Sequence, residues 1–168
     1  MLWGRTRYAA RMKLGAQNDV VVQPIAAGDI RPLFPLIQAV EPGLLWSQWD
    51  RYARRLARGR ASAKEGIIVA RRRGQKHPCG VVCYRRQGDL RYGSVLTAEH
   101  FVAIDLLYPQ AVLAALAGAL DDLAAGFGCA AIRSIVRKSD TDIVDELRMA
   151  GHSDDGRTLT KRRVPGTS

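Results

Sequence analysis

The sequence predicts one domain of the α/β class, an α+β arrangement in which helices flank a central mixed, mostly antiparallel sheet. Residues 101–151 show the pattern strand, long helix, strand, helix, with turn-forming residues at each joint. Two strand-like segments precede them at the spacing of an antiparallel hairpin. The chain of 168 residues, 47% hydrophobic and 25% charged, is long enough to bury one substantial core.

We expect this domain to span residues 19–165 and residues 1–18 to form a disordered extension. The extension contains no acidic residue and carries four basic ones, which are Arg5, Arg7, Arg11 and Lys13. An arginine-rich, acid-poor start is also typical of a targeting presequence, which is the alternative interpretation.

The first half of the domain is predicted to contain a strand, two helices and a hairpin. Residues 19–24 (DVVVQP) form an opening strand that ends at proline. The two helices are expected to be capped by Asp29 and Ser47, because apolar residues recur at helical spacing after each of them. Residues 65–72 and 79–86 are branched, apolar segments separated by a short turn, which predicts two antiparallel strands.

The segment Phe101–Leu107 (FVAIDLL) is apolar and branched, which predicts a buried central strand. A turn at residues 87–89 and an approach through residues 90–96 lead into it. Asp105 is out of character in such a strand, because a buried carboxylate is costly without hydrogen bonds. It either faces a cleft or caps a neighbouring loop, and the sequence leaves both readings open.

The last third of the domain is predicted to be a strand–helix unit followed by a closing strand. A long amphipathic helix covers residues 109–127, and its first residue is a proline, which is favoured there. Residues 130–136 form a second apolar strand. A long helix between two strands predicts a parallel pair with a right-handed crossover. Residues 140–151 are the last helix, and residues 157–164 are expected to close the sheet.

The chain is strongly basic, with a net charge of +10 and a pI of about 10.2. This excess points to an acidic partner, either nucleic acid or a phosphorylated small molecule, or to an arginine-rich proteome. Ten basic residues are concentrated in one region: Arg51, Arg54, Arg55, Arg58, Arg60, Lys64, Arg71, Arg72, Arg73 and Lys76. They are expected to form a basic rim that attracts an anionic ligand, or else a solvated helix face.

The cysteines and the hydropathy pattern indicate which cellular compartment and which kinds of site the sequence is compatible with. Cys79, Cys83 and Cys129 form neither a CxxC pair nor a disulfide pattern, so we expect core packing in a reducing cytoplasm and no metal site. No apolar run approaches the roughly 18 residues that a membrane span needs.

The order of the elements over residues 19–165 resembles that of the GNAT superfamily of N-acetyltransferases. The segment IDLLYPQAVLAALAGAL stands where that family has a strand, a proline and a phosphate loop of the form Gln/Arg-x-x-Gly-x-Gly/Ala. Pro109 matches the proline, and Gln110 and Ala115 match the ends of the loop. Leu113 replaces its first glycine, and the loop is shorter than in the family.

A second resemblance surrounds the last helix, where the family has Asn-x-x-Ala-x-x-Leu-Tyr-x-Lys-x-Gly-Phe. Aligned on Gly151, Asp140 falls on the asparagine and Leu147 on the tyrosine. In the family that tyrosine often protonates the leaving thiolate, which leucine cannot do.

The resemblance implies that acetyl-CoA, or another acyl-CoA, lies along the central strand with its pyrophosphate at the start of the following helix. The cofactor-binding residues would be Leu106, Leu107, Tyr108, Gln110, Ala111, Val112, Leu113 and Asp140. The catalytic candidates are Glu99 and His100, one of which would be the general base. Because neighbours on an extended chain point to opposite faces, at most one of them is expected to face the cleft. A solvated glutamate and a structural histidine are the plain alternative.

The leading hypothesis is therefore an acetyl-CoA-dependent N-acyltransferase that acts by direct transfer on an unidentified amine of a small molecule or peptide. The basic rim suggests that this acceptor is anionic. The alternative is a catalytically inactive, GNAT-shaped module that binds an anionic ligand or nucleic acid. Nucleic acid is not favoured, because the sequence lacks a recognition-helix or aromatic-sheet pattern. A homodimer formed through a sheet edge is a third hypothesis.

Overall fold

The computed structural model describes residues 19–59, 64–156, 158 and 160. Their five strands are β1 (Val20–Pro24), β2 (Glu65–Arg72), β3 (Gly80–Asp89), β4 (Gly93–Ala103) and β5 (Ala131–Ser134). They form one sheet in sequence order, in which every neighbouring pair is antiparallel except the parallel pair of β4 and β5. This confirms the predicted mixed, mostly antiparallel sheet and the parallel strands on either side of the long helix.

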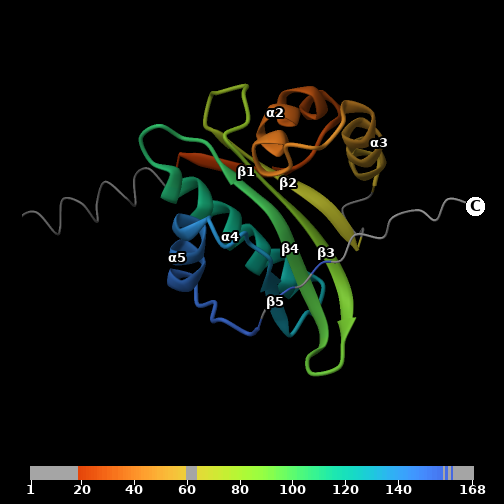
Figure 1. The fold of residues 1–168 in the computed structure, drawn as a ribbon, viewed down its shortest axis with the longest axis vertical. Helices are drawn as coiled ribbons and strands as arrows, with labels where there is room; N and C mark the ends of the chain where they lie inside the picture. Colours follow the sequence, from red (N-terminus) through yellow and green to blue (C-terminus); the bar gives the residue numbers. More distant parts are fainter. Residues whose placement is uncertain (1–18, 60–63, 157, 159, 161–168) are drawn as a thin grey trace, which may run out of the picture.

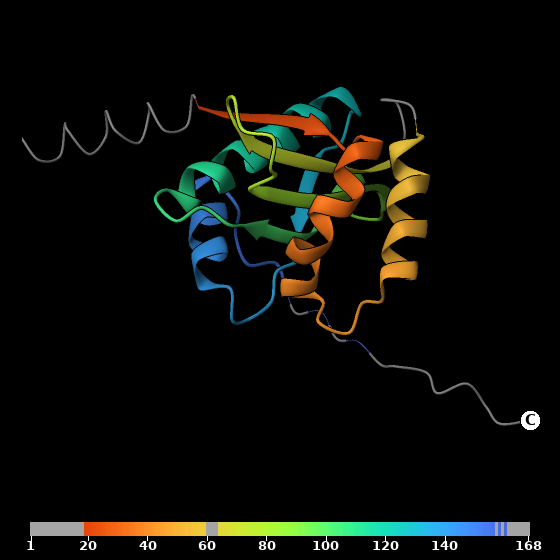
Figure 2. The ribbon, with the colours of Figure 1, turned by 90° about the horizontal axis from the view of Figure 1, so that it is seen from above.

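Helices cover both faces of this sheet, as Figures 1 and 2 show. They are η1 (Ala27–Asp29), α2 (Ile30–Val40), α3 (Trp46–Ala57), α4 (Pro109–Gly126) and α5 (Thr141–Met149). One core cluster lies between α2, α3 and the sheet, and a second lies between the sheet and the pair α4 and α5. Strands β2 and β3 contribute side chains to both clusters, because successive side chains along a strand point to opposite faces of the sheet.

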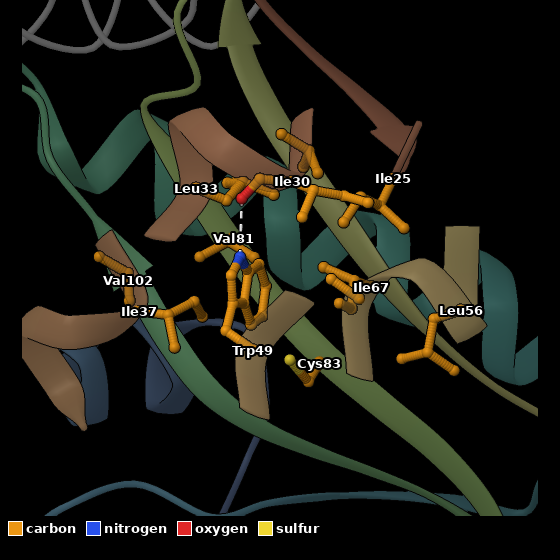
Figure 3. Packing of buried hydrophobic residues seen from close by; sticks show 12 residues of the cluster. Ile25, Ile30, Leu33, Ile37, Trp49, Leu56, Ile67, Val81, Cys83 and Val102 are labelled. Carbon is orange, nitrogen blue, oxygen red and sulfur yellow. Dashed lines mark hydrogen bonds between the residues drawn. The ribbon is translucent and has the colours of Figure 1, made fainter. Parts of the chain in front are cut away.

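Trp49 is the centre of the cluster under α2 and α3 (Figure 3). Its side chain is 2% exposed, and its indole Nε1–H donates a hydrogen bond to the carbonyl of Ile30 at 2.7 Å. A buried indole needs such a partner. This bond joins the first turn of α3 to the first residue of α2, so it fixes how the two helices pack against each other.

The prediction that residues 101–107 form a buried central strand holds only for its first three residues, which are the end of β4. This strand begins at Gly93 and ends at Ala103, so residues 104–107 lie outside the sheet. The strand in the middle of the sheet is β3, and β4 lies between β3 and the edge strand β5. Leu106 and Leu107 are 100% and 77% exposed. The apolar run misled the prediction, because its second half continues past the strand into the loop that leads to α4. The Asp105 carboxylate caps that loop, which decides between the two readings left open for it.

Other boundaries differ by a few residues. The predicted turn at residues 87–89 belongs to β3, because the ladder continues to the pair Asp89 and Gly93. The second helix begins at Trp46 and not after Ser47, since the side chain of Gln48 accepts the Leu45 amide proton. Residues 1–18 and most of the predicted strand at 157–164 lie outside the described residues, so those two expectations stay predictions.

Candidate active site

The pairing with β5 covers only the first part of β4. It runs from Val95 with Ala131 to Ala98 with Ser134, and the Ile135 amide makes one more bond to the Ala98 carbonyl. Beyond this point β4 continues to Ala103, but β5 has ended. Residues 99–103 of β4 therefore have an edge on that side that pairs with no strand of the described chain.

A bulge in β4 lies where the two strands part. On the other side of β4, Val81 pairs with Val102 and Cys83 pairs with Glu99, so β4 has one residue more than β3 between these pairs. His100, inside this bulge, has a φ of 58°, a left-handed conformation that non-glycine residues rarely adopt. A bulge bends its strand and re-aims the side chains near it, and strain of this kind is often found at functional sites.

A cleft of about 210 Å³ opens between the unpaired part of β4, the segment that follows β5 and the end of α2. It is lined by Val40, Glu41, Glu99, His100, Phe101, Ile135, Val136, Arg137 and Asp140. Both predicted catalytic residues, Glu99 and His100, contribute to this lining. The expectation that at most one of them faces the cleft is wrong, because the bulge interrupts the alternation on which it was based.

Glu99 lies beside two groups that stay uncharged. Its partner across the β3–β4 ladder is Cys83, and burial raises the pKa of that thiol to about 12. Tyr52 of α3 lies close to both residues, and burial also raises the pKa of its phenol. The nearest cation is Arg85, whose guanidinium is 3.8 Å from Oε1 of Glu99, too far for a direct hydrogen bond. The Glu99 carboxylate is thus only loosely paired.

Two contacts hold the end of α2 over the cleft. Nδ1 of His100 lies 3.3 Å from Oε1 of Glu41, directly after the last residue of α2. Arg137, in the loop after β5, donates to both carboxylate oxygens of Asp140 at 3.0 and 3.2 Å and to the Val40 carbonyl at 3.2 Å. The first contact links β4 to the end of α2, and the second links the loop before α5 to the same end of α2. The two sides of the cleft are therefore both held to the helix end that covers it.

The lining of the cleft is negative although the chain is strongly basic. Glu41, Glu99 and Asp140 contribute three carboxylates, and Arg137 contributes one guanidinium that is already held by Asp140. A positively charged ligand is therefore favoured in the cleft, while the chain as a whole carries +10.

The predicted phosphate-binding residues lie in the loop before α4 and at the start of that helix. Several of them are buried in the core or already donate their backbone amides to another group of the chain. Val112 and Leu113 are buried core residues, whereas Gln110 is exposed. The amides of Leu107 and Tyr108 donate to Oδ1 of Asp105 at 3.0 and 2.7 Å. The other oxygen of Asp105 accepts from Nε of Arg72 at 2.8 Å. The Arg72 hydrogen bond is the main reason that the pKa of Asp105 is lowered to about 2.

Of the two residues taken from the second family motif, one lines the cleft and the other belongs to the core. Asp140 lines the cleft and precedes α5, as the resemblance implied. Leu147, at the position of the family's tyrosine, is a buried core residue. Sequence reasoning missed Glu41 and Arg137. Arg137 could have been found, because residues just after the carboxyl end of a parallel strand commonly line a ligand crevice.

The basic rim predicted over residues 51–76 is partly neutralised. Arg54 pairs with Asp50, and Arg55 with Glu65. Arg71 pairs with Asp29, and Arg72 with Asp105. These four arginines hold the domain's own carboxylates, so less of the rim is available to an external anion than the sequence suggested.

Comparison with known proteins identifies this architecture. The structure of a transcriptional regulator from Bacillus halodurans C-125 matches with a TM-score of 0.74 at 15% identity, over 86% of this chain and 99% of that one. The aminoglycoside N-acetyltransferase AAC(6')-Iy in complex with CoA matches with a TM-score of 0.73 at 13% identity, over 86% and 94%. The chain has the GNAT fold. The predicted fold and the resemblance are thereby confirmed.

A further GNAT-fold neighbour is the ribosomal-protein-alanine N-acetyltransferase from Brucella melitensis biovar Abortus 2308, with a TM-score of 0.66 at 16% identity, over 86% of this chain and 99% of that one. No protein-family model and no curated protein matches the sequence. In the part of the chain that the structure describes, no helix has both the length and the apolar character to cross a bilayer. At these identities the likeness establishes the fold alone.

Proposed function

We propose that the chain is an N-acyltransferase that moves an acetyl or other acyl group from an acyl-CoA-type thioester to an amine by direct transfer. The observation that carries this proposal is the cleft beside the unpaired part of β4, which holds Glu99 and His100 on a GNAT fold. The bound thioester would supply an activated acyl group. The chain's own residues have to deprotonate the amine, hold the two reactants together and manage the leaving proton.

Glu99 is the proposed general base. An amine enters the cleft as an ammonium ion, which the negative lining attracts, and its nitrogen cannot attack before it has lost a proton. The Glu99 carboxylate takes that proton. The new carbon–nitrogen bond then forms as the carbon–sulfur bond breaks, and a second proton passes from the nitrogen to the departing sulfur. Burial keeps the neighbouring thiol of Cys83 and phenol of Tyr52 protonated, so neither of them competes with Glu99 for this role.

His100 is the proposed partner for the second proton. Its contact with Glu41 favours the tautomer that carries a proton on Nδ1, which leaves Nε2 to exchange protons in the cleft. Leu147 occupies the position of the family's tyrosine and cannot act as an acid, so the task falls to a group on β4. The strained backbone at His100 holds the imidazole at the point where the strands part.

The residues around the cleft fit one half of the implied cofactor. The edge of β4 at residues 99–103 can pair with the two amide groups of a pantetheine arm, in the way that a free strand edge accepts an extended chain. Asp140 and Arg137 would border the arm on the side of α5. The diphosphate half is different, because the amides of Leu107 and Tyr108 are already bonded to a carboxylate.

The acceptor is proposed to be a cationic amine, since the cleft lining carries more carboxylates than cations. This departs from the anionic acceptor expected from the basic rim. AAC(6')-Iy, one of the structural neighbours, is an aminoglycoside N-acetyltransferase, so the acceptor of that protein is an amine. The alternative function, a binding module for nucleic acid, loses support because four of the arginines in the rim are paired within the domain.

The test combines donor binding with turnover. Calorimetric titration of acetyl-CoA into the purified chain is expected to show binding, and thiol release is expected to require an amine. Glu99→Gln keeps the size of the side chain and removes the base, so we expect donor binding to be retained and kcat to fall by about 100-fold or more. Glu146→Gln, on the last helix and away from the cleft lining, is the matched control. Unchanged turnover in Glu99→Gln would refute the assignment of the base.

A further inference from the structure

The start of α4 is already satisfied by groups of the chain itself. Pro109, the first residue of the helix, has no N–H. The Ala111 amide donates to the Tyr108 carbonyl at 3.1 Å, and the Leu107 and Tyr108 amides donate to Asp105. Within residues 107–111, all of which the structure describes, this leaves the Gln110 amide for an external ligand. A helix start usually binds anions because several of its amides are free.

The electrostatics of this loop also oppose a bound diphosphate. The pKa of Asp105 is lowered to about 2, so its side chain is a carboxylate at neutral pH. It is 12% exposed and already holds the two amides and the Arg72 guanidinium. A diphosphate placed against these amides would have to displace Asp105 and would meet its negative charge. The exposed side chains of Leu106 and Leu107 flank the same position and offer no polar partner.

The same arrangement occurs at a second place in the chain, where no ligand is expected. Asp89 accepts the Arg91 and Tyr92 amides at 2.9 and 3.0 Å through one oxygen and the Arg133 guanidinium at 2.7 Å through the other. It closes the turn between β3 and β4. The loop at Asp105 is thus a self-contained structural turn of the same type, and not an anion cradle awaiting a ligand.

We infer that this chain recognises its acyl donor through the pantetheine arm and does not hold the diphosphate end at the start of α4. The inference rests on the proposed function, since it concerns the donor of that reaction. It defines the donor class as thioesters of a pantetheine arm, whether or not a nucleotide is attached. The binding free energy would come from the β4 edge and the cleft, and Asp105 would be the residue that excludes the nucleotide end.

Two donors that differ in the nucleotide alone provide the test. Acetyl-CoA and acetyl-pantetheine are titrated calorimetrically into the wild-type chain at about 0.5 M salt, where non-specific attraction of a tetra-anion to a basic protein is largely screened. We expect the two dissociation constants to agree within about threefold, a difference of less than roughly 1 kcal/mol. Binding of acetyl-CoA that is about 30-fold tighter or more would overturn the inference.

A variant tests the role assigned to Asp105. Asp105→Ala releases the two amides and removes the carboxylate charge, so acetyl-CoA is expected to bind about tenfold tighter while acetyl-pantetheine is unaffected, because hydrogen bonds to the charged diphosphate become available. Asp89→Ala removes the equivalent carboxylate from the other turn and is the matched control, with neither affinity changed. No gain for acetyl-CoA in a folded Asp105→Ala would contradict the exclusion. Where that variant fails to fold, the comparison of the two donors on the wild type decides.

The outcomes separate this inference from the proposed function. If neither donor binds at millimolar concentration, the acyltransferase proposal fails and the inference fails with it. If acetyl-CoA binds tightly and acetyl-pantetheine does not, the acyltransferase proposal stands and the inference alone is refuted.

Discussion

Asp105→Asn is expected to lower the free energy of unfolding by about 2 kcal/mol at pH 7. The native pKa of Asp105 is about 2, against an ordinary value of 3.8, mainly because Arg72 donates a hydrogen bond to its carboxylate. The difference between these pKa values corresponds to roughly 2.5 kcal/mol of stability at neutral pH. The side chain is 12% exposed, so solvent weakens this interaction little. Asparagine keeps an acceptor for the two amides, which retains part of the effect.

The sign of the pH dependence follows from the lowered pKa. Between the native and the unfolded pKa of Asp105, the unfolded chain binds more protons, so the stabilisation is complete above about pH 5 and is lost as the pH falls toward 2. Urea unfolding of wild type and variant across this range gives the difference in free energy directly. We expect this difference to be constant from pH 7 to about pH 5 and to shrink below it.

Asp145→Asn is the control for this experiment, because its side chain is 72% exposed and its removal is expected to change stability by less than about 0.5 kcal/mol. A difference between wild type and Asp105→Asn that stays the same down to pH 2.5 or so would show that the carboxylate charge is not what stabilises the loop. No difference at pH 7 would refute the argument as well.

Three further predictions follow from other parts of the structure. Cadaverine, aminopentanol and aminopentanoate present a cationic, a neutral and an anionic end on chains of equal length, and turnover should fall in that order. Because Glu41 also contacts His100, Glu41→Gln can change the rate with every acceptor, but it should lower the rate with cadaverine about threefold more than that with aminopentanol. Trp49→Phe removes the donor to the Ile30 carbonyl and should lower the unfolding free energy in urea by about 1–3 kcal/mol. In Gly80→Ala the new Cβ would overlap Cγ1 of Val112, and we expect the free energy of unfolding to fall by about 1–3 kcal/mol, seen as a lower Tm; an unchanged Tm would contradict this packing.

Local sequence patterns predicted most of the architecture. The hairpin segments, the long helix after Pro109 and the two parallel strands around it could be found because hydrophobic periodicity and turn residues act over a few neighbouring positions. The resemblance to the GNAT family, and not these local patterns, implied roles for Glu99, His100 and Asp140, and all three line the cleft. Whether they perform the proposed chemistry stays a prediction.

The sequence failed where a residue's role depends on distant partners. The run FVAIDLL reads as a strand, yet β4 ends at Ala103, because the ladder with β3 and the Asp105 cap decide where the strand stops. The alternation of Glu99 and His100 is interrupted by a one-residue bulge, which depends on the register between two strands. Glu41 gives no local sign of function, since its place beside His100 results from the packing of α2 against β4.

What the sequence alone determined is therefore the order and type of the elements, because helix and strand periods are properties of short segments. What the tertiary structure decided is the electrostatics of the site. It paired four arginines of the basic rim within the domain and gathered three carboxylates in the cleft. A net charge of +10 contains no information about this arrangement, because the field at a cleft depends on which charges face it and which are already neutralised.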